Sequence, residues 1–238
     1  MGADQHIDWK HAAASALDWW HDAGVDTLVD ETPRRWLEAA PQSRPAQAVP
    51  TESAPALPTT LADFEAWRVS AAAPDAGWGA PIGPQGSAES RLMILLDMPE
   101  RGDAASGQLL SGEAGRLFDN MLAAIGRDRQ SIYLASLAVA RPASGRIAAE
   151  RIGSLADVAR HHIALAQPKR LLLLGDAANR ALLGVSAAAT RPILHVLNHG
   201  AGQTEAVASF HPRFLLDNPA QKARAWRDLQ VLIGGIDA

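Results

Sequence analysis

The chain has 238 residues, a formal net charge of −4 and no cysteine. This length allows one domain with a sizeable core, and the lack of cysteine excludes disulfides and zinc–thiolate sites. No apolar run of about 18 residues or more is present, so a membrane helix is not expected. The first residues are polar, unlike a signal peptide. We therefore expect a cytoplasmic protein that is a monomer and has no membrane contact.

The N-terminal quarter differs in composition from the rest of the chain. An amphipathic pattern over residues 11–21 predicts a helix, and Pro33 suits the first turn of a second, short helix. Residues 41–60 are rich in Pro, Ala, Ser and Gln, which is typical of a flexible linker. The leader either packs within the chain, which we favour, or binds a protein partner. The predicted parts are a Trp-rich helical leader (1–40), a Pro/Ala-rich linker (41–60) and an α/β domain (61–238).

Strand-like and helix-like patterns alternate through the remainder of the chain. Thr60 to Asp63 has the features of a helix start, and the Gly- and Pro-rich residues 77–86 predict a loop. Strands joined through helices form mainly parallel sheets whose two faces the helices cover. We therefore predict an α/β fold with three layers, α/β/α, around a central, mostly parallel sheet. The expected strands are 91–96, 132–138, 170–174, 193–197 and 205–210, and the expected helices are 113–125, 154–166, 176–183 and 219–233.

Polar residues stand at the ends of three of these strands. Asp97 follows the first strand, Ser136 lies near the end of the second, and His211 follows the last. Open α/β sheets bind ligands at the carboxyl ends of their strands. The sequence therefore predicts one site shared by these three residues. A structural alternative stays open, in which Asp97 fixes a loop or caps a helix and His211 only marks the exit from a strand.

Three motifs occur in a fixed order around these positions. They read Leu96-Asp97-Met98-Pro99-Glu100, then Gly107-Gln-Leu-Leu-Ser-Gly112-Glu-Ala-Gly115, and finally His211-Pro212-Arg213. This set resembles the uracil-DNA glycosylase superfamily, most closely its bacterial iron–sulfur branch, usually called family 4. That family has Gly-Glu-Ala-Pro-Gly, Gly-x-Pro-Phe-x-Gly-x-Ala-Gly and His-Pro-Ser/Ala in the same order. The resemblance covers roughly residue 61 to the C-terminus, and it implies the same α/β fold.

The resemblance also implies a reaction on DNA. The family flips a nucleotide out of the stack, breaks the bond between base and sugar, and lets water capture the oxocarbenium-like sugar. Asp97 stands at the motif glutamate, which orients that water. Asp103 falls in the family's acidic stretch and is a second acidic candidate. His211 matches the histidine that donates a hydrogen bond to the departing base.

The residues expected around the base depart from the family pattern. Met98 and Pro99 border the pocket, Leu110 replaces a Phe that stacks on uracil, and Ser136 replaces an Asn that reads its edge. Loss of an aromatic platform costs about 1 to 3 kcal/mol of base binding. A single hydroxyl cannot reproduce the paired hydrogen bonds of an amide. We therefore expect weakened or altered base recognition.

Metal binding is not expected in this chain. The resembling family holds a [4Fe–4S] cluster through four cysteines, and a cluster needs thiolate ligands. Here the third cysteine position is Ala140, the fourth lies near Leu155, and the first two fall between Trp67 and Asp75. We predict no metal and no cofactor, with Ala140, Leu155 and Trp67 filling the space by apolar packing. Surface or packing roles are expected for the histidines at 161, 162, 195 and 199.

Because the total charge is negative, DNA binding has to rely on a local basic face. Arg141 and Arg146 lie in a loop that the family places beside its substrate, where they either contact phosphates or form a solvated face. Asn198 and His199 stand where related proteins approach the minor groove. The DNA-contacting residues that we predict are Arg141, Arg146, Arg213, Asn198 and His199.

Two functions of different class follow from these patterns. The first is a DNA-repair glycosylase of base excision, which hydrolyses the N-glycosidic bond of a flipped uracil or another damaged base. The second is a catalytically silent protein of the same fold that binds DNA or a protein partner. Asp97, Asp103 and His211 favour the chemistry, whereas Leu110 and Ser136 favour its loss.

Overall fold

The computed structural model describes residues 9–22, 57–186 and 193–234. They form helix α1 (Trp9–Asp22) and an α/β body, and each is described by itself. Helix α1 confirms the first predicted helix and exposes Leu17, Trp19 and Trp20. The second leader helix and most of the predicted linker lie outside the described residues. No helix in the described part of the chain is long and apolar enough to cross a membrane.

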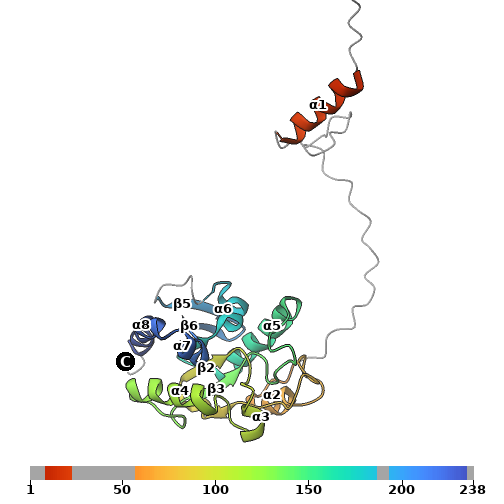
Figure 1. Cartoon of the computed structure of the whole chain (residues 1–238). Helices are drawn as coiled ribbons and strands as arrows, with labels where there is room; N and C mark the ends of the chain where they lie inside the picture. The colour runs from red at the N-terminus through yellow and green to blue at the C-terminus, as the bar shows by residue number, and fades with distance from the viewer. Residues whose placement is uncertain (1–8, 23–56, 187–192, 235–238) are drawn as a thin grey trace, which may run out of the picture. The chain divides into compact units, whose positions relative to one another are not determined.

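A six-stranded sheet forms the centre of the body (Figure 1). Its strand order is β1-β3-β2-β4-β6-β5, with parallel pairing between β3, β2, β4 and β6 and antiparallel pairing at both edges. The predicted, mostly parallel sheet is confirmed. The strands are β1 (Gln85–Gly86), β2 (Leu92–Leu96), β3 (Tyr133–Ser136), β4 (Arg170–Leu174), β5 (His195–His199) and β6 (Gly202–Ser209).

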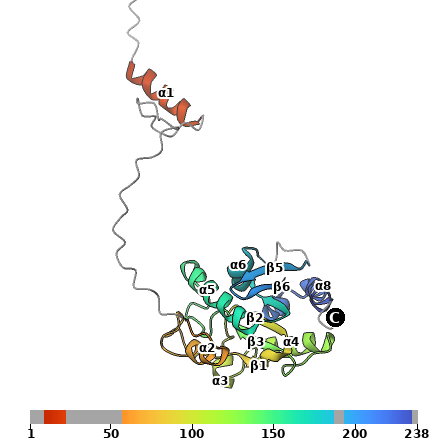
Figure 2. The ribbon, with the colours of Figure 1, turned by 180° about the vertical axis from the view of Figure 1, so that it is seen from behind.

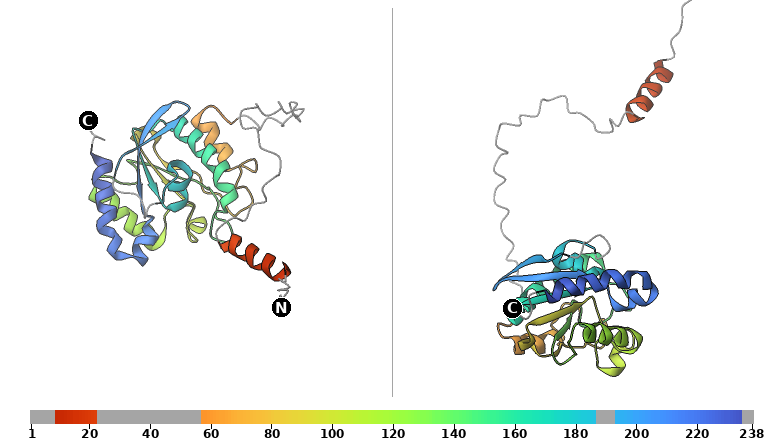
Figure 3. Two further views of the ribbon diagram at one scale, coloured as in Figure 1. Left: turned by 90° about the horizontal axis from the view of Figure 1, so that it is seen from above. Right: turned by 90° about the vertical axis from the view of Figure 1, so that its left-hand side faces the viewer.

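Helices cover both faces of this sheet, which gives the predicted three layers. The helices of the body are α2 (Leu61–Arg68), α3 (Asp103–Ser106), α4 (Gly112–Ala124), α5 (Ala149–Ala166), α6 (Asp176–Leu183), α7 (Pro212–Asp217) and α8 (Lys222–Ile233). Successive strand residues point to opposite faces, so Leu95 packs in a core with α5 and α6, and Ile94 packs in a core with α4 and α8. Figures 1, 2 and 3 show these two pairs of helices on opposite sides of the sheet.

Most differences from the predicted elements lie at their ends. The helix start at Thr60 is confirmed, since its Oγ1 accepts a hydrogen bond from Asp63 N (3.2 Å). Helix α7 was not predicted, although Pro212 in its first turn is a usual start signal. The expected helix 219–233 is a short 3-10 turn, Pro219–Gln221, followed by α8. Strands β5 and β6 begin and end at different residues than expected because they form a hairpin whose exposed edge strand carries little apolar pattern.

A buried ion pair fastens the segment before the first strand to the end of β3. The side chains of Arg68 and Asp75 are 2% and 0% exposed, and they bind each other. Arg68 Nη2 also donates to Leu137 O (2.6 Å), and Asp75 Oδ2 accepts from Val139 N (2.5 Å). The two side chains therefore satisfy backbone groups just beyond Ser136, where the strand has ended.

This ion pair lies at the position that the family resemblance gives to the iron–sulfur cluster. Ala140 and Leu155 are buried there as predicted, but Trp67 is only half-buried. A cavity of about 220 Å³ remains beside Ala140. Without a thiolate, these residues do not fit an iron–sulfur cluster. Apolar packing thus accounts for only part of the space, and the cross-link between the two segments is ionic.

Arg68→Met should lower the free energy of unfolding by about 3 to 5 kcal/mol, because it leaves Asp75 buried without its cation. Urea titration followed by circular dichroism measures this. Adding Asp75→Asn should recover much of the loss, since a neutral amide still accepts from Val139 N. Arg116→Met, which removes an exposed arginine, is the control and should change stability by no more than about 0.5 kcal/mol. Equal losses for both arginine variants would show that the pair is not a cross-link.

Candidate active site

The carboxyl ends of β2, β4 and β6 surround one cavity of about 260 Å³. Asp97 follows β2, Gly175 follows β4, and His211 follows β6. The structure therefore brings two of the predicted residues, Asp97 and His211, to the same place. The cavity is lined by Asp97, Gly175, Asp176, Phe210, His211, Arg213 and Phe214.

The Asp97 carboxylate lies against the backbone that follows β4. It accepts a hydrogen bond from Ala178 N at 2.7 Å. A Cβ at Gly175 would lie 2.4 Å from the carboxyl carbon of Asp97, so a glycine is required for this approach. Burial raises the pKa of Asp97 to about 6, against the opposing effect of its backbone hydrogen bonds. At neutral pH the group is mostly ionised and has a pKa suited to a general base.

His211 is held as a neutral hydrogen-bond donor. It is the N-cap of α7, and its Nδ1 accepts from Arg213 N at 3.2 Å. A nitrogen that accepts cannot carry the proton of a neutral imidazole, so the hydrogen is on Nε2. Burial, and then the nearby Arg213, lower the pKa of His211 to about 4. The side chain is thus an uncharged N–H donor at neutral pH.

Glu100 joins this site from the loop after β2. Its Oε2 lies 3.2 Å from Arg213 Nη1, and its Oε1 lies 3.6 Å from His211 Nδ1. Burial raises the pKa of Glu100 above its usual value, although the nearby charges of Arg213 and Arg141 oppose this effect. Glu100 is not among the site residues predicted from the sequence. The signal available was an acidic residue directly after Met98-Pro99, where the family keeps a glycine.

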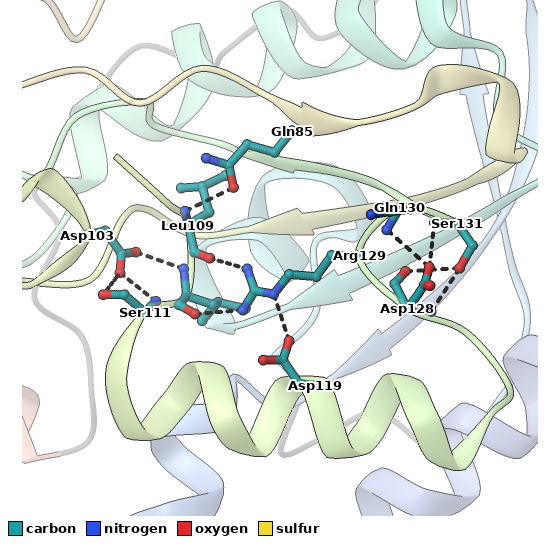
Figure 4. A network of polar contacts seen from close by, with 10 residues as sticks. Gln85, Asp103, Leu109, Ser111, Asp119, Asp128, Arg129, Gln130 and Ser131 are labelled. Atoms are coloured by element: carbon teal, nitrogen blue, oxygen red, sulfur yellow. Dashed lines mark hydrogen bonds and ion pairs between the residues drawn. The ribbon is translucent and has the colours of Figure 1, made fainter. Parts of the chain in front are cut away.

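Asp103 organises a loop and lies outside the cavity. Its fully buried carboxylate accepts hydrogen bonds from Leu110 N (2.9 Å), Ser111 N (2.7 Å), Ser111 Oγ (2.6 Å) and Glu100 N (2.8 Å). Figure 4 shows it beside Ser111, at the start of α4. A carboxylate with this many donors has no free lone pair positioned for water. The structure therefore does not support the predicted catalytic role of Asp103.

Leu110 is also part of this loop rather than of the cavity. It is fully buried with a left-handed φ of 54°. Arg129, held by Asp119 at 2.6 Å, donates to Leu109 O (2.7 Å) and Leu110 O (2.8 Å), as Figure 4 shows in part. A Cβ at Gly115 would lie 1.9 Å from Leu110 O, which explains the glycine in the second motif.

The other predicted base-pocket residues are buried as well. Met98 and Pro99 are covered, and Ser136 is 6% exposed. The hydroxyl of Ser136 has no hydrogen-bond partner among the described residues. Neither Leu110 nor Ser136 lines the cavity that contains Asp97 and His211. The carboxyl end of β3 is therefore closed over, although it keeps one unsatisfied polar group.

An aromatic pair lines the cavity instead. Phe210 and Phe214 are stacked, with ring centroids 5.2 Å apart and planes 15° apart. Phe214 is 41% exposed. This pair is not among the site residues predicted from the sequence, and its signal there is a second Phe three residues after His211.

The predicted DNA contacts fall into three groups. Arg141 is bound to the loop that follows β2, because its Nη1 donates a hydrogen bond to Pro99 O at 3.0 Å. Arg146 is exposed, and Arg213 lines the cavity. Asn198 and His199 pair with Gln203 and Gly202 at the amino end of β6, whereas the cavity adjoins its carboxyl end.

At about 3.3 Å per residue, the seven steps between Gly202 and Ser209 put His199 roughly 23 Å from the end of β6 that adjoins the cavity. Thr204 Oγ1 binds His199 Nε2 at 2.9 Å, which gives the imidazole a structural partner. The structure therefore does not support the prediction that Asn198 and His199 contact DNA at this site. The described residues also contain no group of three or more His, Cys, Asp or Glu side chains that could hold a metal ion.

Comparison with known proteins decides the family. Residues 84–230 match the family model described as the uracil DNA glycosylase superfamily. The chain belongs to this superfamily. Two relatives come from Pyrobaculum aerophilum. Its type-5 uracil-DNA glycosylase is 26% identical over 150 residues, or 57% of this chain and 66% of that protein. Its type-4 uracil-DNA glycosylase is 22% identical over 158 residues, or 63% of this chain and 81% of that protein.

Asp103→Ala should lower the free energy of unfolding by about 3 to 5 kcal/mol, because it leaves the buried N–H groups of Leu110 and Ser111 without an acceptor. Thermal and urea unfolding measure the loss. Asp157→Ala, which removes a carboxylate that is 82% exposed, is the control and should stay within about 0.5 kcal/mol of the parent. If Asp103→Ala were as stable as that control but had lost activity, Asp103 would have a chemical role.

Asp97→Asn should stabilise the protein at pH 7 and not at pH 4. The folded pKa of about 6 lies above the ordinary 3.8, so the carboxyl costs stability as the pH rises through this interval. The difference between these two pKa values corresponds to a loss of up to about 3 kcal/mol in the free energy of unfolding at pH 7, and the neutral amide does not have this loss. Urea titrations of both proteins at the two pH values measure the difference, and the titration of His211 cancels. A stabilisation that did not depend on pH would contradict the raised pKa.

Proposed function

We propose that this superfamily member is a DNA N-glycosylase that removes a flipped, damaged base, with base recognition altered from the uracil pattern. The observation that carries the proposal is the neutral Nε2–H of His211 and the carboxylate of Asp97 in one cavity at the strand ends. At neutral pH the two groups can play opposite roles. Asp97 is ionised and can accept a proton, whereas His211 is neutral and can donate a hydrogen bond. The relatives named above are uracil-DNA glycosylases.

The reaction uses these two groups in one displacement. As the bond between C1′ and the base nitrogen breaks, its electron pair goes to the base and C1′ gains oxocarbenium character. A water attacks C1′ and gives a proton to the Asp97 carboxylate. His211 donates its Nε2–H to an oxygen of the departing base and stabilises the negative charge that develops there. Because His211 is neutral, it keeps its proton after the base has left.

We expect altered base recognition because Leu110 and Ser136, at the positions that the family uses to bind the base, are buried outside the cavity. The family's stacking aromatic is here Leu110, which is buried in the Asp103 loop. The family's amide is here Ser136, a single hydroxyl. The cavity offers one neutral donor, one carboxylate and an aromatic wall, rather than a complementary amide for a uracil edge. A reduced preference for uracil over other damaged bases is the expected result.

The second candidate function is a catalytically silent protein that binds DNA or a protein partner. The burial of Leu110 and Ser136 favours it, because both stand where the family holds the base. Docking of a protein partner on the Trp-rich leader stays a prediction, as do the cytoplasmic location, the monomeric state and the lack of a cofactor. This candidate retains the site as a binding surface without turnover.

Excision assays on labelled oligonucleotides that carry uracil, hypoxanthine or xanthine test the proposal. We expect abasic sites on at least one of them, and a single-turnover rate that falls about tenfold per pH unit below about pH 6 as Asp97 becomes protonated. Asp97→Asn should lose about 10²- to 10⁴-fold and the pH dependence with it. His211→Ala should lose about 10²- to 10³-fold. Arg116→Ala, an exposed change on α4, should leave the rate unchanged.

The silent alternative predicts a different outcome. The protein would then leave no abasic site on any of the three lesions between pH 5 and pH 9, although it still binds DNA. Activity that survives unchanged in both Asp97→Asn and His211→Ala would place the reaction elsewhere and end the proposal.

A further inference from the structure

Two further hollows lie on the surface of the α/β body, outside the cavity of Asp97 and His211. The nearer one, about 300 Å³, is lined by Pro99, Glu100, Arg101 and Arg141 among others. The farther one, about 430 Å³, is lined by residues that include Trp78. Pro142 lines both hollows, and Glu100 links the nearer one to the cavity through Arg213. We call the two hollows together the arginine groove, and its main residues are Trp78, Arg101, Arg141, Pro142, Arg146 and Arg151.

The charge of this groove is opposite to that of the whole chain. Four arginines and a single acidic residue, Glu100, line it, while the chain carries a formal net charge of −4. Glu100 is engaged by Arg213 at 3.2 Å. Arg101 and Arg146 are exposed. The groove therefore provides the local basic face that an acidic protein needs in order to bind a polyanion.

An aromatic platform stands in the outer hollow. Trp78 is half-buried, and the guanidinium of Arg151 lies over its ring at 5.7 Å. Arg151 is itself tied to Pro74 O. Trp78 and Arg151 both line the hollow, so the indole and the guanidinium together offer flat groups against which a base can stack, and every base has a face that suits them. A paired base within a duplex does not present that face, so the platform favours an unpaired strand.

The loop that forms one wall of the groove is rigidly built. Arg141 Nη1 donates to Pro99 O at 3.0 Å, and Gly145 N donates to Pro142 O at 2.8 Å. Ser144 Oγ donates to Arg146 O at 3.0 Å. Arg141 is thereby used to fix the loop, whereas the Arg146 side chain stays exposed on the turn that the loop makes. The groove is preorganised, which lowers the entropic cost of binding.

We propose that the arginine groove binds the single strand on one side of the flipped nucleotide, with Trp78 stacking on an unpaired base and Arg146 contacting a phosphate. This rests on the proposed function for the identity of the nucleotide in the cavity. The groove is a separate nucleotide subsite, because none of Trp78, Arg146 and Arg151 lines the cavity of Asp97 and His211. The substrate class is then a lesion in single-stranded or locally opened DNA.

Fluorescence anisotropy with labelled single-stranded DNA tests this. Each oligonucleotide carries one tetrahydrofuran abasic analogue and either one or eight nucleotides on each side. The intact protein should bind the longer strand more tightly. Trp78→Ala should bind the longer strand about 5- to 150-fold more weakly and the shorter one unchanged. Arg146→Ala should reduce the slope of log K against log salt by about 0.7, which is one phosphate contact on a single strand.

Controls separate stacking from folding. Trp78 also packs against the core, so Trp78→Phe, which keeps an aromatic ring, should bind within about fivefold of the intact protein. Circular dichroism shows whether each variant is folded. Arg116→Ala removes an exposed arginine of α4 and should change neither the affinity nor the salt slope. An RNA strand of the same sequence reports whether the groove distinguishes the sugar.

The outcomes for the two proposals differ. If Trp78→Ala and Arg146→Ala bind the longer strand like the intact protein, or if strand length has no effect, the groove proposal is overturned even when excision is normal. If excision is absent but the length effect and its loss in Trp78→Ala are seen, the groove is supported and the glycosylase proposal fails. If the intact protein binds neither strand, the groove proposal is overturned, and the excision assay alone decides the glycosylase proposal.

Discussion

Parallel pairing of β2, β4 and β6 puts Leu96, Leu174 and Ser209 side by side at one edge of the sheet. The chain leaves each strand at that level, and the next residues are Asp97, Gly175 and Phe210. Three segments that are far apart in sequence thus meet at one cavity. The register of the backbone hydrogen bonds between the strands brings them together, and no contact between their side chains is required. The close approach of Asp97 to Gly175 is possible only with this register, since a slip by one residue would turn the carboxylate to the other face.

Buried carboxylates serve two purposes in this molecule, and their partners distinguish them. Asp75 has a guanidinium and a backbone N–H, and Asp103 has four donors. Both hold loops at the carboxyl end of the sheet. Asp97 accepts from the backbone at the start of α6, the charge of Arg213 in the same cavity offsets its desolvation only in part, and its pKa is raised to about 6. A carboxylate that is fully hydrogen-bonded stabilises structure, whereas one that is buried and incompletely compensated is available for proton transfer.

Features that depend on local sequence could be predicted, whereas features that depend on contacts between distant parts of the chain could not. In β4, Leu171 to Leu174 form a continuous apolar run that ends at Gly175, so the position of this strand is a local property of the chain. Asp97 and His211 could be placed because parallel strands share one functional edge. Asp103 could not, since its role depends on Leu110 and Ser111 folding back onto it. The Arg68–Asp75 pair and the distance of His199 from the cavity depend on tertiary contacts and on the hairpin register, which no local pattern contains.

His211 closes the start of α7 with the same nitrogen that determines its tautomer. Proton transfer to Nδ1 would therefore remove a helix cap as well as change a charge, and α7 carries Arg213 and Phe214 on its first turns. The hydrogen bond between Arg213 N and His211 Nδ1 thus couples the helix that lines the cavity to the protonation state of His211. Acid that charges the imidazole, at about pH 4, would therefore remove the capping hydrogen bond of the helix that carries Arg213 and Phe214.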